Sequence, residues 1–148
     1  MLNGRYTENY LASVPAALEH GVFISAAGEG KIVFAARSDY ATAADRVISD
    51  DGHAGKVYEL AGDEARTLSH LAKELAEQSG KNVVYQNLSQ ADFVAALKNA
   101  GLPDELSEML ADFDVGASVG GLFDDSHTLS KLIGRPTTTL AESIKNIL

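Results

Sequence analysis

Residues 3–9 hold the largest uninterrupted group of side chains that could bind a ligand. The segment reads Asn3-Gly4-Arg5-Tyr6-Thr7-Glu8-Asn9. Asparagine followed by glycine favours a tight turn, and glycine lets exposed backbone approach a bound molecule closely. Amide, phenol and carboxylate groups then offer hydrogen-bond donors and acceptors close by. The pattern predicts a ligand-binding turn, although it also fits a plain Asn3-Gly4 turn followed by Thr7 as a helix cap.

A dinucleotide site needs glycines at a strand-to-helix turn, where the amino terminus of the helix meets the pyrophosphate. The best local match, at residues 28–30, lacks the third glycine and leads into a β-branched run instead of a helix. The glycines within residues 116–121 have no strong strand before them, and no P-loop pattern occurs. We therefore expect no phosphate-binding loop in this chain.

No group of residues forms a recognisable catalytic unit. The chain has no cysteine, and its four histidines lack the spacing of metal-ligand pairs. Ser126 and Ser130 have no histidine and carboxylate arranged nearby that would make either serine a nucleophile. Asp124, Asp125 and His127 could hold a metal ion, but a helix-capping acidic turn is the expected role of this cluster. No catalytic residue and no metal site are therefore assigned.

Composition narrows the class of protein. The chain has 148 residues and a net charge of −9, and its acidic residues are scattered. General nucleic-acid binding relies on lysine and arginine to neutralise phosphates, so this charge argues against it. No stretch approaches the roughly 20 apolar residues of a membrane span, and the first residues lack a signal-peptide pattern. These features predict one globular domain without disulfides, located in the cytoplasm.

The hydrophobic patterning predicts an α/β or α+β domain in which helices form the larger share. Short strands are expected at residues 22–24, 31–35, 56–60 and 82–86, with the first two joined by a hairpin or another tight connection. A first helix is expected to end near residue 20, with Pro15 as a kink or a second start. The expected helix caps are Thr7, Asp39, Thr67, Ser89 and Thr139.

Three of the expected helices carry apolar stripes at spacings of three and four residues, which put each stripe on one face. The stripes are Ala43, Ala44, Val47 and Ile48 in one helix, Leu68, Leu71, Ala72 and Leu75 in the next, and Leu106, Met109, Leu110 and Phe113 in the last. We expect all three to be buried in the core. The glycine-rich segment 116–123 is expected to be an irregular loop.

Three or four short strands separated by long helices make a thin sheet for a free-standing domain. Such a set would be more stable at the edge of a larger sheet, so a partner is expected to be missing. An unfinished edge exposes unpaired backbone groups and apolar surface. The chain by itself is therefore expected to self-associate.

Four separated segments resemble, in order, the NmrA-like NAD(P)H:quinone oxidoreductases, a branch of the atypical short-chain dehydrogenases. They are residues 3–10, 58–64, 121–126 and 129–138. The similarity covers nearly the whole chain, and the order of the four segments makes the combined pattern specific. One departure is Arg5, because the relatives usually carry an aromatic residue at this position.

The resemblance implies that residues 1–148 are the carboxy-terminal, substrate-side portion of a Rossmann-type NmrA-like fold, without the amino-terminal half that binds the dinucleotide. NADP is then the cofactor of the intact protein, and this chain alone is not expected to bind it. A quinone is the expected small-molecule substrate. The chain lacks the Tyr-x-x-x-Lys pair of many short-chain dehydrogenases. This is compatible with quinone reduction, because hydride can pass directly from nicotinamide to a quinone.

The resemblance also implies which residues border the two ligands. The expected cofactor-binding residues are Asn3, Gly4, Arg5, Tyr6 and Arg37, and the expected substrate-binding residues are Tyr6, Glu8 and Asn9. Arg37 has the alternative role of a surface salt bridge beside a capping Asp39. Two alternative functions also stay open, namely a dinucleotide-sensing regulator without turnover and a cofactor-free interaction domain.

Overall fold

The computed structural model describes residues 1–148 and contains eight helices and six short strands. The helices are α1 (Thr7–Leu11), α2 (Val14–His20), α3 (Arg37–Ser49), α4 (Leu68–Ser79), α5 (Gln90–Asn99), α6 (Asp104–Ser118), α7 (Thr128–Ile133) and α8 (Leu140–Lys145). The strands are β1 (Leu2–Asn3), β2 (Val22–Ser25), β3 (Ile32–Val33), β4 (Glu59–Leu60), β5 (Ala65–Arg66) and β6 (Val84–Asn87). The predicted helix-rich α/β class is confirmed. None of the helices combines the length and the apolar character that crossing a membrane requires.

The strands form three separate two-stranded ladders, so the expected single thin sheet is wrong. Strand β1 pairs with β4 and β2 pairs with β6, both in parallel, while β3 and β5 are antiparallel. One further parallel bridge joins Tyr6 to Ala35. Because parallel neighbours need a long crossover connection, each parallel ladder joins segments that are far apart in the sequence.

The expected hairpin between β2 and β3 is also wrong, because the connection at residues 28–30 packs elsewhere. A Cβ atom on Gly30 would stand 2.2 Å from the carbonyl oxygen of Ala117, at the end of α6. The backbone N–H of Gly28 donates to Asn87 Oδ1 at 2.9 Å. These glycines therefore serve close packing against α6 and β6, and β2 pairs with β6 instead of β3.

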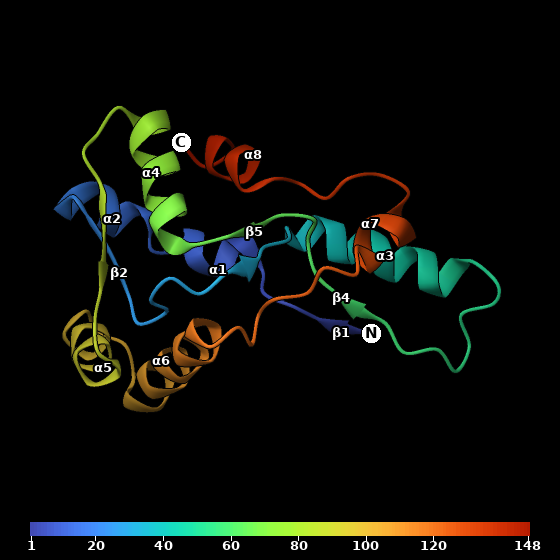
Figure 1. The fold of residues 1–148 in the computed structure, drawn as a ribbon, viewed down its shortest axis with the longest axis horizontal. Helices are drawn as coiled ribbons and strands as arrows, with labels where there is room; N and C mark the ends of the chain where they lie inside the picture. Colours follow the sequence, from blue (N-terminus) through green and yellow to red (C-terminus); the bar gives the residue numbers. More distant parts are fainter.

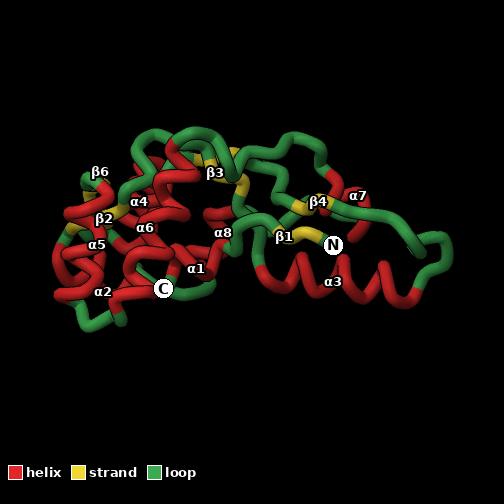
Figure 2. Tube along the Cα trace, turned by 90° about the horizontal axis from the view of Figure 1, so that it is seen from below, coloured by secondary structure: helices red, strands yellow, loops and turns green.

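The elements gather into two groups along the long axis of the molecule (Figure 1). Helices α2, α5 and α6 lie with β2 at one end, while α3 and α7 lie with β1 and β4 at the other. Figure 2 shows the same separation from a second direction, with α3 running along one side of the β1–β4 end. Helix α8 packs on α4 and α1, between the two groups.

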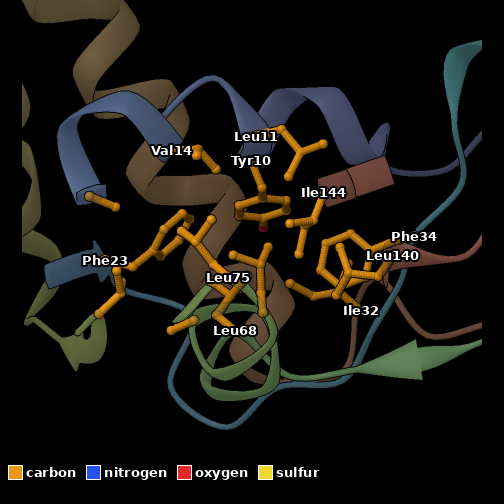
Figure 3. Packing of buried hydrophobic residues seen from close by; sticks show 14 of the residues in the cluster. Tyr10, Leu11, Val14, Phe23, Ile32, Phe34, Leu68, Leu75, Leu140 and Ile144 are labelled. Carbon is orange, nitrogen blue, oxygen red and sulfur yellow. The ribbon is translucent and has the colours of Figure 1, made fainter. Parts of the chain in front are cut away.

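The largest core cluster lies where α1, α2, α4 and α8 meet, and Figure 3 shows its labelled side chains pointing toward one another. The predicted stripe of α4 is confirmed, because Leu68, Leu71 and Leu75 are completely buried. The rings of Tyr10 and Phe34 meet edge-on, 5.5 Å apart. Burying each large apolar side chain contributes about 1.5–3 kcal/mol, so this cluster holds the four helices together.

Helix α6 is oriented opposite to the prediction. Leu106, Met109 and Phe113 are 38%, 45% and 47% exposed, so the expected core stripe faces largely outward. The helix also continues to Ser118, which makes the expected loop at 116–118 helical. The residues that it buries are the small or polar Ser107, Ala111, Asp114 and Ala117. Helix α3 differs in the same direction, because Ala43 is buried but Ile48 is exposed.

The reason for the orientation of α6 is the carboxylate of Asp114, which is only 3% exposed. It accepts hydrogen bonds from the hydroxyls of Tyr10 at 3.1 Å and Ser25 at 2.5 Å, and from the backbone N–H of Ala26 at 3.2 Å. A buried carboxylate needs such donors to offset its lost hydration. All three come from α1 or the end of β2, so they fix which face of α6 points inward.

Two of the predicted helix caps are wrong. Thr7 is the first residue of α1 and is completely buried, and Tyr6 precedes the helix without a side-chain cap. Asp39 lies inside the first turn of α3, and its buried carboxylate accepts from Arg135 Nη2 and from the backbone N–H of Thr138, both at 2.7 Å. Both side chains are used in tertiary packing. The caps predicted at Thr67, Ser89 and Thr139 are confirmed.

Gly62 provides a test of how tightly the chain crosses itself between β4 and β5. A Cβ atom on Gly62 would stand 1.8 Å from the carbonyl oxygen of Phe34, so Gly62→Ala must displace backbone. We expect a loss of about 1–3 kcal/mol in the free energy of unfolding, measured with urea. The control is Gly116→Ala in α6, where a Cβ atom meets nothing within 4 Å. It should gain up to about 1 kcal/mol from helix propensity. Equal stabilities of the two variants would contradict the close crossing.

Candidate functional site

A hollow of about 560 Å³ lies beside the amino-terminal segment. Its walls are residues 2–5, the end of β4 at residues 59–61, Val33, and the loop at residues 121–125. Three of these walls, at residues 3–5, 59–61 and 121–125, belong to segments singled out in the sequence. The fold therefore brings together segments more than a hundred positions apart.

Gly4 joins two walls of the hollow. Its backbone N–H donates to the carbonyl oxygen of Leu60 at 2.8 Å, which continues the β1–β4 ladder. A Cβ atom on this residue would stand 2.9 Å from the same oxygen and 3.3 Å from the Tyr40 hydroxyl. The predicted Asn3-Gly4 turn is wrong, because Asn3 ends an extended strand. The glycine permits the close approach of two protein segments.

Tyr6 lies next to the hollow, in contact with Asn3 and Tyr40. Asn3 Nδ2 donates to the Tyr6 hydroxyl at 3.1 Å, and the rings of Tyr6 and Tyr40 are 5.0 Å apart. Burial, with a smaller effect of Tyr6, raises the pKa of Tyr40 far above the usual value for a phenol. Tyr40 is therefore a neutral, protonated support for the Tyr6 ring.

Glu8, Asn9 and Arg37 form a cluster beside the hollow and do not line it. Both carboxylate oxygens of Glu8 accept from the backbone N–H of Arg37, at 3.0 and 3.2 Å. Arg37 Nη2 donates to Asn9 Oδ1 at 3.2 Å, and its guanidinium lies over the Tyr6 ring at 5.6 Å. Arg37 takes part in no ion pair, so the predicted salt-bridge alternative is wrong. The cluster fixes the start of α3 against α1.

Arg5 is the cationic residue of the hollow. Its guanidinium carbon lies over the rings of Tyr10 and Phe113, at 5.0 and 5.2 Å from their centres. Its Nε is buried without a hydrogen-bond partner, and Arg5 takes part in none of the ion pairs of the chain. The aromatic rings therefore hold a cation that has no carboxylate partner.

Tyr10 connects Arg5 to the buried carboxylate of Asp114. Burial first, and then the charge of Asp114, raise the pKa of Tyr10 far above its usual value, while the nearby Arg5 opposes this change. The Tyr10 hydroxyl stays protonated at neutral pH and donates to Asp114. Sequence reasoning missed this group. The available signal was a stripe of small and polar residues, Ser107, Ala111 and Asp114, beside the apolar stripe of α6.

The acidic loop at residues 121–125 leads into a second group, centred on Asp63. Asp63 Oδ1 accepts from Ser130 Oγ at 2.7 Å and lies 2.8 Å from His127 Nδ1. A histidine and a carboxylate therefore lie close to Ser130, but not in the order that would make this serine a nucleophile. A nucleophile would need histidine between serine and aspartate, whereas here the aspartate lies between the other two.

Thr137 completes the Asp63 group, since its backbone N–H donates to Asp63 Oδ2 at 2.8 Å. The expected capping role of the acidic loop is also wrong. His127 stands at the start of α7 without a side-chain cap, and Asp124 accepts from the backbone N–H of Ser126 within its own turn. No set of three or more histidine, aspartate or glutamate side chains in the chain is placed to hold a metal ion.

The fold of the chain matches half of the structure of two reductases that were solved with NADP(H) bound. The structure of Citrobacter sp. triphenylmethane reductase complexed with NADP(H) matches with a TM-score of 0.94 and 35% identity, over 99% of this chain and 51% of that chain. The structure of the Escherichia coli NADPH-dependent quinone oxidoreductase complexed with NADPH matches with a TM-score of 0.96 over 98% of this chain and 51% of that chain.

In sequence, the chain is 74% identical over 145 residues to quinone oxidoreductase 2 of Escherichia coli K12. The match covers 98% of this chain and 51% of that protein, so the chain spans about half the length of the curated relatives that it matches. No protein-family model matches the chain. The predicted resemblance to NmrA-like quinone oxidoreductases is confirmed by these similarities.

The Asp63 group supplies a prediction on stability and pH. Desolvation raises the pKa of Asp63, but hydrogen bonds from Thr137, Ser130 and His127 outweigh it and hold the pKa below its usual value. A lowered pKa in the folded state means that the unfolded chain takes up the proton first as pH falls. The stabilisation by Asp63 is therefore complete above the usual aspartate pKa of about 3.9 and decreases below it.

At pH 7, Asp63→Asn should lower the free energy of unfolding by about 1–2 kcal/mol, because it leaves inward-facing donors without a charged acceptor. The difference from the unmodified chain should shrink as pH falls from about 5 to about 3. Urea unfolding across this range measures it. The matched control is Asp51→Asn, an exposed aspartate without side-chain contacts, which should change little at any pH. A difference that stays constant with pH would rule out the ionised form of Asp63 as the stabilising species.

Proposed function

We propose that residues 1–148 are the carboxy-terminal, substrate-side part of a longer NAD(P)H-dependent quinone oxidoreductase. The observation that carries the proposal is the hollow bounded by residues 3–5 and 121–125, in a chain 74% identical to half of a quinone oxidoreductase. The amino-terminal half of the longer protein binds the nucleotide portion of the cofactor. The hollow is one wall of the cleft between the two parts.

The residues present fit the ring end of a dinucleotide and not its phosphates. Arg5 lines the hollow without an ion-pair partner, so its guanidinium is available to an oxygen atom of a bound ring. The glycines at 28 and 30 are packed against α6 and β6, so they do not form an open phosphate turn. The phosphates of NADPH are therefore bound by the other half of the longer protein.

Reduction of a quinone to a hydroquinone takes up two electrons and two protons. A bound reduced nicotinamide supplies a hydride, which is one proton with both electrons. Water supplies the second proton, and Tyr10 and Tyr40, whose pKa values burial raises, do not line the hollow. The side chains of this wall orient the quinone. Asn3 and Arg5 offer the polar groups of the wall, and Tyr6, supported by the Tyr40 ring, hydrogen-bonds to Asn3 beside it. The cluster of Glu8, Asn9 and Arg37 lies beside the hollow and fixes α1 against the start of α3.

The first test uses the longer protein. Loss of NADPH absorbance should require both the protein and a quinone, with one NADPH consumed per quinone. NADPH binding without turnover on any quinone would favour a dinucleotide-sensing regulator instead. A protein that binds neither would be a cofactor-free interaction domain, and the proposal would be wrong.

The second test uses residues 1–148 alone, which should show no NADPH binding by calorimetry. They contribute only the ring-side wall, and most of the binding free energy for a dinucleotide comes from its phosphates and adenosine. Micromolar binding by this chain would contradict the division of roles between the two parts.

The isolated chain should also self-associate, through open strand edges and the outward apolar face of α6. Sedimentation velocity at increasing concentration measures this, and Met109→Glu on that face should shift the chain toward monomer. A chain that is monomeric at every concentration would count against an unfinished edge.

A further inference from the structure

A second cavity, of about 460 Å³, lies between α2 and α5. It is enclosed by α1, α2, β2, α5 and one residue of α6, and twelve of its fifteen lining residues are hydrophobic. Phe93, Leu97 and Leu110 are among its lining residues, and so is the half-buried Ala96. We call it the apolar chamber. Its volume lies in the range of pockets that bind small molecules.

Shared lining residues connect the apolar chamber to the hollow by way of a small cavity and Arg5. A small cavity of about 60 Å³ lies between them, and it shares Phe93, Leu97 and Leu110 with the chamber. Arg5 is the single residue that lines both this small cavity and the hollow. A ligand that extends from the hollow toward the chamber must therefore pass the guanidinium of Arg5.

Arg5 requires an acceptor oxygen that the protein does not supply. Its Nε is buried without a partner, and two aromatic rings hold its guanidinium in place. Arg5 lines the hollow and makes no ion pair within the chain, so a ligand oxygen in the hollow would supply the acceptor that its guanidinium lacks. The hollow also contains the carboxylates of Glu59, Asp124 and Asp125, which disfavour an acidic ligand. The best match is the carbonyl oxygen of a neutral ring.

The apolar chamber determines which substituent on the ring can be bound. A charged or strongly polar substituent would lose its hydration there without gaining hydrogen bonds, apart from those at the edge residues Asn9, Ser13 and His20. A hydrocarbon chain makes no hydrogen bonds with water that it could lose there, and it gains apolar contact along its length. Ring and chain together describe one kind of molecule, a quinone with an aliphatic side chain.

We infer that the substrate is a quinone with an aliphatic side chain, whose ring oxygen is bound by Arg5 and whose side chain occupies the apolar chamber. This inference rests on the proposed function, because it places the reacting ring in the same hollow. It adds the substrate class and a specificity role for Arg5 and for the chamber.

The experiment compares two substrates in the longer protein, a methylated benzoquinone and the same ring carrying a decyl chain. We expect kcat/KM to be at least about tenfold higher for the decyl compound, through a lower KM, because of the added apolar contact. Ala96→Phe, which fills part of the chamber, should bring the ratio of the two kcat/KM values close to one. The matched control is Ala95→Phe on the neighbouring exposed position of α5, which does not line the chamber and should keep the ratio.

Equilibrium dialysis of both quinones without NADPH separates this inference from the proposed function. Arg5→Gln should weaken the binding of both compounds by roughly tenfold, because it removes a charged donor to the shared ring oxygen. Chamber-dependent binding of the decyl compound without NADPH oxidation would sink the proposed function and leave the subsite standing. Quinone-dependent oxidation with equal kcat/KM for both compounds, unaffected by Ala96→Phe, would overturn the inference and leave the function standing. Unchanged binding of both quinones in Arg5→Gln would show that Arg5 does not bind the ring oxygen.

Discussion

The buried carboxylate of Asp114 determines the arrangement around the candidate site. Placing a carboxylate at 3% exposure is costly, and the cost is offset only because Tyr10, Ser25 and the backbone of Ala26 all donate to it. These donors lie on α1 and β2, so α6 must turn its small, polar face inward. Phe113 then faces outward, where its ring meets the guanidinium of Arg5. The position of that cation thus depends on a hydrogen-bonded anion at the next residue of the same helix.

The other end of the molecule is held by the same kind of interaction. Asp39 binds Arg135 and Thr138, and Asp63 binds Ser130 and Thr137. Both carboxylates connect the segment before α8 to parts of the chain far away in the sequence. Three separate two-stranded ladders cannot supply this cohesion, since none of them shares a strand with another. The carboxylates of Asp39 and Asp63 provide long-range connections that a continuous sheet would otherwise provide. These connections help to hold the acidic loop at residues 121–125 beside the amino-terminal segment.

The sequence predicted what depends on local physics and missed what depends on long-range polar contacts. The stripe of α4 and the caps at Thr67 and Thr139 involve neighbours within one or two turns, so spacing alone identifies them. Asp39 looked like a cap because aspartate is common there, but its partners lie almost a hundred residues away. The prediction that the apolar stripe of α6 is buried was wrong for the same reason, because the partners of Asp114 lie far away in the sequence. Of the predicted site residues, Asn3, Gly4 and Arg5 line the hollow, but the apolar chamber had no signal, because its walls come from four separate helices.

Arg5 shows why an arginine is stable at a position where the resemblance predicts an aromatic residue. A guanidinium is planar and weakly hydrated, so it stacks on aromatic faces much as another ring would. Tyr10 and Phe113 provide those faces. The substitution therefore keeps the packing of a flat side chain and adds donors that an aromatic residue lacks. A carboxylate partner within the chain would neutralise those donors, whereas the carboxylate of Asp114 is already saturated by its own three. The charge of Arg5 is thus left available to the hollow, between a polar wall on one side and the apolar chamber on the other.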